Sequence, residues 1–201
     1  MGRPTLVVVT GEPGSGKSTL GRALAAELHL PYLSRDDVRW GLRATAGLWT
    51  NNMTEDVDRR NAVESFLHLI ETAAQLGVTA VLEYMVFTSN PETLDRLHAV
   101  ANCLVVLTES RNSDGRASHR DRQDLLLRRP EVLAALGHES IGDYLSGSGR
   151  ETARSPMIRD FDLPTLRVRT DDGYEPPMRA IVDWVVALSE GAGEEPPRAV
   201  P

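Results

Sequence analysis

The sequence predicts an α/β fold, a three-layer sandwich in which a five-stranded parallel sheet carries helices on both faces. Short apolar runs rich in Val, Ile and Leu, which are typical of strands buried on both faces, recur along the chain. Stretches with apolar residues at helical spacing lie between these runs. Strands that alternate with helices form a parallel sheet, because the crossover between neighbouring strands then contains a helix.

Five strands are expected, at residues 5–10, 31–34, 78–87, 103–107 and 163–169. Helices are expected at residues 17–29, from 35 onward, 55–76, 90–101 and 177–188. The charged helical stretch at 111–136 is broken at Pro130 and predicts a helical lid before the last strand. We assign residues 1–190 to one domain, and we expect residues 191–201, dominated by Glu, Pro and Gly, to form a disordered tail.

The segment Gly11–Thr19 carries the strongest chemical signal. Its sequence GEPGSGKST matches G-x-x-x-x-G-K-[ST], the loop that surrounds phosphate groups. It contains Lys17, the one lysine among the 22 lysine and arginine residues of the chain. A compact ammonium fits beside a phosphate within a ring of backbone amides, where a guanidinium is too broad. An ordinary glycine-rich turn is disfavoured, because the expected strand, loop and helix all agree with the P-loop NTPase form of the sandwich.

This motif predicts a nucleotide site residue by residue. Lys17 is expected to reach the β- and γ-phosphates, and Ser18 is expected to ligate Mg²⁺. The loop amides and the positive end of the following helix would hold the remaining phosphate charge. The expected nucleotide-binding residues are Gly11, Gly14, Ser15, Gly16, Lys17, Ser18 and Thr19.

Two aspartates follow the second expected strand and should therefore emerge at the same sheet edge as the loop. A carboxylate from Asp36 or Asp37 could accept the proton of an attacking hydroxyl in phosphoryl transfer, or hold Mg²⁺ through water. Arg39 falls on the same side and could fix an anionic or hydroxyl-bearing acceptor. The alternative is that Asp36 caps the helix and Asp37 is a solvated partner of the helix dipole. Beside a phosphate loop we favour the functional interpretation.

At these two motifs, Gly11–Thr19 and Ser34–Arg39, the chain resembles the kinase domain of polynucleotide 5′-kinases. That domain belongs to a wider group of small P-loop kinases, with chloramphenicol phosphotransferase, zeta toxins and gluconate kinase. The resemblance implies that Asp36 is the general base and that Arg39 contacts a substrate phosphate. It also implies ATP as the phosphoryl donor, with GTP left open.

Arginines crowd the start of the expected lid. Arg116 and Arg120 are four residues apart and share a helical face. The resemblance implies that such a pair closes over the triphosphate, where it would neutralise charge on the transferring group. The alternative is a solvated helix whose arginines pair with neighbouring aspartates.

Two features depart from the family pattern. The third expected strand carries Glu83, where many P-loop proteins have an aspartate, and we expect it near Mg²⁺ or the acceptor. The segment 40–61 offers Trp40, Trp49 and two asparagines. Aromatic and amide groups suit a neutral hydroxylated molecule or a stacked nucleobase, although both tryptophans could equally belong to the core.

Composition excludes several classes of function. The net charge of −7 argues against broad nucleic-acid binding, which usually requires a basic face. A single cysteine rules out a disulfide framework within the chain and suits a reducing cytoplasm. No apolar run approaches the length of a membrane span, and the histidines lack zinc-ligand spacing.

The sequence therefore predicts a Mg²⁺- and ATP-dependent kinase that phosphorylates a hydroxyl of a small molecule. A polynucleotide 5′-hydroxyl kinase is the first alternative, favoured by the Asp36–Arg39 pair. A regulatory nucleotide-binding NTPase is the second, although it would not need an acceptor base at this place. The acceptor and the oligomeric state stay open.

Overall fold

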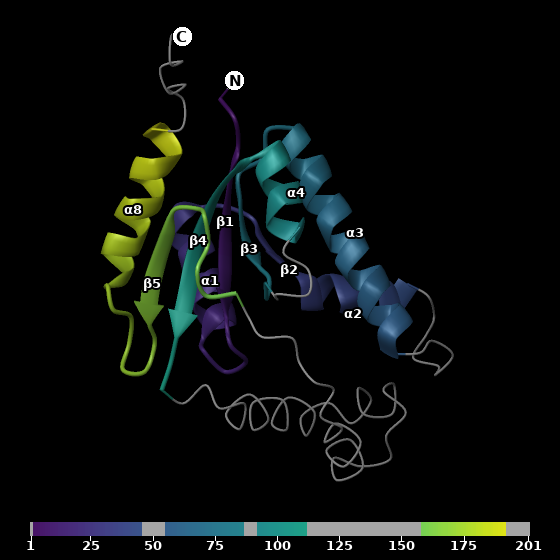
Figure 1. The fold of residues 1–201 in the computed structure, drawn as a ribbon, viewed down its shortest axis with the longest axis horizontal. Helices are drawn as coiled ribbons and strands as arrows, with labels where there is room; N and C mark the ends of the chain where they lie inside the picture. Colours follow the sequence, from purple (N-terminus) through teal and green to yellow (C-terminus); the bar gives the residue numbers. More distant parts are fainter. Residues whose placement is uncertain (1, 46–54, 87–91, 112–157, 192–201) are drawn as a thin grey trace.

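The computed structural model describes residues 2–45, 55–86, 92–111 and 158–191, which form a parallel sheet flanked by helices (Figure 1). The five strands lie in the order β2-β3-β1-β4-β5, and each neighbouring pair is parallel. The predicted α/β sandwich is confirmed. The strands are β1 (Thr5–Gly11), β2 (Tyr32–Ser34), β3 (Ala80–Glu83), β4 (Asn102–Glu109) and β5 (Thr165–Arg169). The helices are α1 (Lys17–Leu28), α2 (Arg35–Thr45), α3 (Glu55–Gln75), α4 (Glu92–Val100) and α8 (Met178–Gly191).

The central strand β1 shows why its sequence is continuously apolar. Successive side chains of a strand point to opposite faces of the sheet. Leu6 and Val8 accordingly enter one core cluster, and Val7 and Val9 enter the other. All four are fully buried because helices cover both faces.

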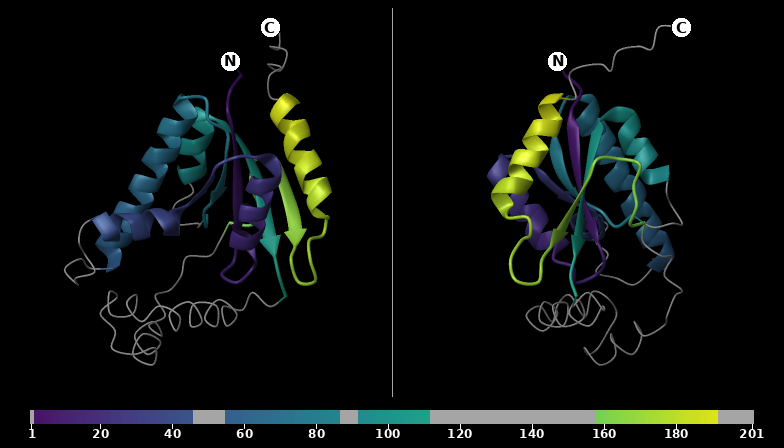
Figure 2. Two further views of the ribbon diagram at one scale, coloured as in Figure 1. Left: turned by 180° about the vertical axis from the view of Figure 1, so that it is seen from behind. Right: turned by 60° about the vertical axis from the view of Figure 1, so that its left-hand side comes forward.

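The helices divide between the two faces of the sheet (Figure 2). On one face, α3 and α4 contribute Phe66, Ile70 and Leu97 to the first cluster. On the other face, α1 and α8 contribute Leu20 and Ile181 to the second. Each helix buries one apolar stripe, in agreement with the periodicity in the sequence.

The main difference from prediction concerns β3, which ends at Glu83 instead of continuing to residue 87. Its neighbour β2 ends at Ser34, the residue that pairs with Glu83, and the chain continues directly into α2. Beyond Glu83, the described chain therefore has no partner strand on that side. The chain beyond still bonds locally, because the Tyr84 amide donates to the Val9 carbonyl at 3.2 Å. The early end of β3 places the Glu83 carboxylate at the carboxyl edge of the sheet.

Several predictions fall on residues outside the described ranges: the lid at 112–136, Trp49, and the tail beyond Gly191. The helix expected from residue 35 onward extends to Thr45. None of the helices described is both long enough and apolar enough to cross a membrane.

Candidate active site

The glycine-rich loop joins β1 to α1 at the carboxyl edge of the sheet (Figure 1). Gly14 and Gly16 have φ angles of 84° and 77°, a left-handed region that glycine occupies without strain. The Ser15 amide donates to the Glu12 carbonyl at 3.0 Å and closes the turn. Lys17 is the first residue of α1, and its Nζ donates to the same carbonyl at 3.2 Å. A tight loop, a helix N-terminus and an ammonium therefore meet in one place, as anion binding requires.

Buried hydroxyl groups join the end of β4 to the glycine-rich loop. The Ser15 and Thr108 hydroxyl oxygens lie 2.6 Å apart, and the Thr108 hydroxyl donates to the Thr10 carbonyl at 3.0 Å. Both side chains are almost fully buried. Gly11 is required here, because a Cβ would lie 2.1 Å from Thr108 Oγ1.

The residue after β5 holds the other side of the loop. The Thr170 hydroxyl donates to the Ser15 carbonyl at 2.9 Å. A Cβ on Gly16 would lie 3.2 Å from the same hydroxyl oxygen. Sequence analysis missed both Thr108 and Thr170. Their positions at the ends of the two strands beyond β1 were the available signal, since parallel strands end at one edge.

Glu83 connects the loop to the neighbouring strands. The Ser18 hydroxyl donates to Glu83 Oε1 at 2.6 Å, and the Tyr32 hydroxyl donates to Oε2. Burial, and then the hydrogen bond to Glu83, raise the pKa of the Tyr32 phenol above its ordinary value. Tyr32 is a further residue that sequence analysis did not single out.

These contacts fit the predicted Mg²⁺ site. When Ser18 donates its proton to Glu83, the lone pairs of its oxygen stay available for a cation. Within the described ranges, no group of three or more His, Cys, Asp or Glu side chains is placed to hold a metal ion. Mg²⁺ is usually held by one or two protein groups together with substrate phosphates and water.

The residues predicted for the acceptor side follow β2, in α2. Because α2 starts at Arg35, directly after β2, Asp36 and Asp37 lie in its first turn at the carboxyl edge. Asp36 Oδ1 lies 2.5 Å from Arg35 Nη2, and its side chain is 52% exposed. Asp37 Oδ2 lies 3.7 Å from Arg22 Nη2 and is 62% exposed. Asp36 is the second residue of α2, within its first turn.

Of the remaining residues predicted to contact the acceptor or to close over the nucleotide, the structure describes Arg39 and Trp40. Arg39 is half-buried in α2. Trp40 lies on the same helix. Arg116 and Arg120 lie outside the described residues, so their closing role stays a prediction.

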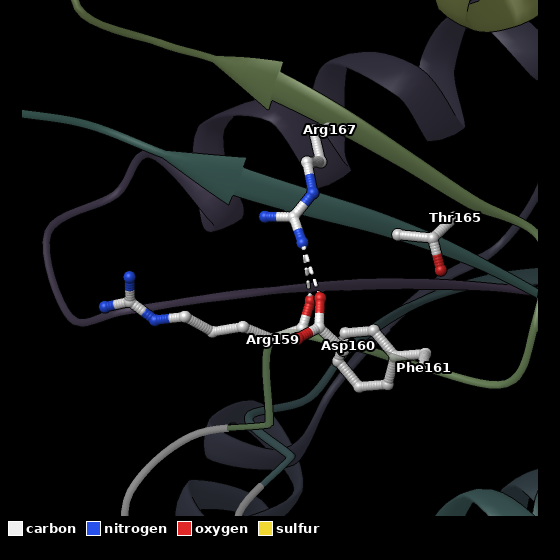
Figure 3. Close-up of a pocket in the computed structure, with 5 residues that line it drawn as sticks. All are labelled: Arg159, Asp160, Phe161, Thr165 and Arg167. Carbon is white, nitrogen blue, oxygen red and sulfur yellow. Dashed lines mark hydrogen bonds and ion pairs between the residues drawn. The ribbon is translucent and has the colours of Figure 1, made fainter.

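A shallow cavity of about 340 Å³ lies beside β5 (Figure 3). It is lined by Arg159, Asp160, Phe161, Thr165 and Arg167. Arg167 donates to the Arg159 carbonyl at 2.9 Å and to Asp160 Oδ1 at 3.0 Å, as the dashed lines show. Arg159 itself pairs with Glu12 of the glycine-rich loop. The cavity contains none of the predicted site residues, and no motif marked Arg159 in the sequence.

Comparisons with known proteins place this geometry in context. A family model described as an AAA domain matches residues 6–133. Among curated proteins, none matches the chain. The chain is similar to the solved structure of a candidate kinase from Chloroflexus aurantiacus J-10-fl, with 25% identity and a TM-score of 0.66. That likeness covers 92% of this chain and 98% of the other.

Two further solved structures share the fold at lower identity. The APS kinase CysC of Mycobacterium tuberculosis, in complex with AMPPNP and APS, is 19% identical with a TM-score of 0.58. The likeness covers 94% of this chain and 99% of CysC. A sugar kinase from Janibacter sp. HTCC2649 is 15% identical with a TM-score of 0.53, over 96% and 99% of the two chains.

Proposed function

The chain belongs to the AAA domain family and to the P-loop kinase group, and from this premise we propose that it transfers the γ-phosphate of ATP to a hydroxyl of a small molecule. The observation that carries the proposal is that a phosphate-binding motif and a pair of carboxylates lie at the same edge of the sheet. The phosphate loop follows β1, and a pair of carboxylates follows β2. A donor site and an acceptor base are the two parts that phosphoryl transfer needs.

On the donor side, the loop amides and the Lys17 ammonium would bind the triphosphate. Ser18 would hold Mg²⁺ together with phosphate oxygens and water, while Glu83 orients the Ser18 hydroxyl. The bound ion supplies positive charge to the phosphate groups. The remaining loop contacts serve to keep these groups in position before the nucleotide arrives.

On the acceptor side, Asp36 would accept the proton of the attacking hydroxyl. The Arg35 guanidinium contacts Asp36 Oδ1 through two nitrogens, at 2.5 and 3.1 Å, and would orient the carboxylate. Arg39, as the resemblance implies, would contact the acceptor, together with Asp37 and Trp40 of the same helix. Arg116 and Arg120 would close from the lid, as the resemblance implies.

A small acceptor is favoured over a nucleic-acid end for two reasons. The net charge of −7 disfavours a polyanionic substrate. Two structural neighbours are named for small-molecule substrates, APS and a sugar. Their identity to this chain is low, so the likeness supports the order in which acceptors are tested and not a particular acceptor.

The test is transfer of label from γ-labelled ATP in the presence of Mg²⁺. Sugars, nucleosides, aminoglycoside- and phenicol-type antibiotics and a 5′-hydroxyl oligonucleotide are supplied in separate reactions. We expect label on a small hydroxylated molecule and none on the oligonucleotide. Label on the oligonucleotide would establish the polynucleotide kinase instead. Release of free phosphate with no labelled acceptor would favour the regulatory NTPase.

A further inference from the structure

Tyr32 has no role in the proposed reaction, yet its hydroxyl contacts the carboxylate that orients Ser18. Tyr32 is the first residue of β2, which pairs with β3. Its hydroxyl donates to Glu83 Oε2, while the Ser18 hydroxyl donates to Oε1 at 2.6 Å. Each oxygen of the carboxylate therefore has its own hydroxyl donor, and the three side chains join α1, β2 and β3.

Two neighbouring residues of α1, Gly21 and Arg22, lie against the Tyr32 ring. The Arg22 guanidinium carbon lies 5.1 Å from the ring centroid, within the range of a cation–π contact. On α1, a Cβ added to Gly21 would lie 2.8 Å from Tyr32 Cε2. Glycine is unfavourable in a helix interior, so the close approach of the ring explains its presence there. The helix that carries Ser18 thus also fixes the position of the Tyr32 ring.

We propose that Tyr32 is a positioning residue for Mg²⁺, which keeps Glu83 Oε1 on the Ser18 hydroxyl by occupying Oε2. This inference rests on the proposed function, because it concerns the ion that accompanies the nucleotide. With both oxygens engaged, the carboxylate has one orientation, and Ser18 directs its lone pairs away from Glu83. Without the Tyr32 hydroxyl, the half-buried carboxylate can rotate and leave the Ser18 proton free to turn toward the cation.

The proposal predicts a defect in Mg²⁺ dependence and not in nucleotide binding as such. ATP binding is measured by calorimetry over a Mg²⁺ titration, and again in EDTA, for the unchanged chain and for Tyr32→Phe. We expect the half-saturating Mg²⁺ concentration to rise about three- to tenfold, the scale for loss of one hydrogen bond of typical net strength. ATP affinity in EDTA should change less than about twofold, because the loop amides and Lys17 are untouched.

The matched control is Tyr174→Phe. Tyr174 is partly buried and packs against the same core cluster as Tyr32, so its substitution removes a phenol hydroxyl from the same layer. We expect its Mg²⁺ titration to coincide with that of the unchanged chain. Thermal unfolding of each variant shows that it folds. A folded Tyr32→Phe variant with an unchanged Mg²⁺ midpoint, or an equal shift in both variants, would overturn the proposal.

A second variant tests the position of the ring without removing the hydroxyl. Gly21→Ala places a methyl group against the ring and should displace it from Glu83. We expect Gly21→Ala alone to raise the Mg²⁺ midpoint, and the Gly21→Ala, Tyr32→Phe pair to differ little from Tyr32→Phe alone. Effects that multiply would show that Gly21 acts independently of the hydroxyl and would contradict the proposed arrangement.

These measurements separate the inference from the function on which it rests. A shifted Mg²⁺ midpoint in Tyr32→Phe, with no hydroxyl acceptor labelled by the unchanged chain, would support the inference and overturn the proposed kinase. Labelling of an acceptor by the unchanged chain, with an unshifted Mg²⁺ midpoint in Tyr32→Phe, would support the proposed kinase and overturn the inference. ATP binding that does not respond to Mg²⁺ in the unchanged chain would overturn the inference directly.

Discussion

The loop after β1 and the first turn of α2 lie at the same edge of the sheet, but they are held by different interactions. The loop rests on the buried hydroxyl of Thr108 in β4, which also bonds the Thr10 carbonyl of β1, and on the half-buried hydroxyl of Thr170 after β5. The α2 turn carries carboxylates that are more than half exposed and that pair with arginines also reached by solvent. Buried hydrogen bonds fix geometry, whereas exposed ion pairs contribute little and adjust easily. The proposed donor end is therefore more firmly held than the proposed acceptor end.

The largest effect should come from the donor end. Lys17→Ala removes the ammonium at the loop, and we expect kcat/KM to fall about a hundred- to a thousandfold, the range for loss of one group that stabilises transition-state charge. Steady-state kinetics with the identified acceptor provide the measurement. A near-normal Lys17→Ala variant would remove the loop from the mechanism.

Asp36→Asn is the matching test at the acceptor end. It keeps the shape of the side chain but cannot accept a proton, and we expect turnover to fall at least about a hundredfold. ATP binding, measured by calorimetry, should stay unchanged, because Asp36 follows β2 and not the loop. Asp37→Asn serves as the control, with a smaller effect expected. If both substitutions have equal effects, Asp36 is not the base.

Thr108→Val tests whether the loop depends on the strand beneath it. Removing a buried hydroxyl that serves Thr10 and Ser15 should lower the free energy of unfolding by about 1–3 kcal/mol and weaken ATP binding. Thr108→Ser should restore both. Thr5→Val, in a buried threonine at the opposite end of β1, is the control for stability. If Thr5→Val weakens ATP binding as much as Thr108→Val does, Thr108 has no specific role in holding the loop.

The smallest effect concerns the rim of the donor end. The Ser110 hydroxyl and the Arg111 amide donate to Asp171, and the Ser110 contact is the main cause that lowers its pKa below the ordinary value of 3.8. A carboxyl group with a lowered pKa stabilises the fold above its unfolded pKa and loses that contribution as the pH falls through the folded pKa. Asp171→Asn should therefore destabilise slightly at pH 6, and the difference should shrink below about pH 4. Urea unfolding at both pH values measures this; a difference that grows in acid would have the wrong sign.

The contrast between the two ends also explains what the sequence could reveal. The loop was predictable because glycine conformations and backbone amides impose a fixed local spacing from Gly11 to Thr19. The strands were predictable where burial on both faces makes them apolar, as in β1 and β4. The end of β3 was not, because it depends on where its neighbour β2 stops.

Contacts between distant segments could not be predicted from the sequence for the same reason. Thr108 and Thr170 are ordinary residues until the sheet order brings β4 and β5 beside the loop. Tyr32 is an unremarkable strand residue until Gly21 and Glu83 flank it. No local pattern encodes these pairings.

The buried Cys103 shows the converse: an apolar neighbourhood was visible in sequence, and burial raises the pKa of its thiol to about 12.

The threonine hydroxyls that join the glycine-rich loop to β4 and the end of β5 make the loop part of the same cooperative unit as the sheet. Local opening of the loop would have to break the buried contact between Ser15 and Thr108 and the half-buried hydrogen bond from Thr170. The ordering of this segment is thus completed when the chain folds. In the proposed function, a triphosphate would bind to a loop that is already ordered, so its binding would carry little of the entropy cost that ordering a loop adds.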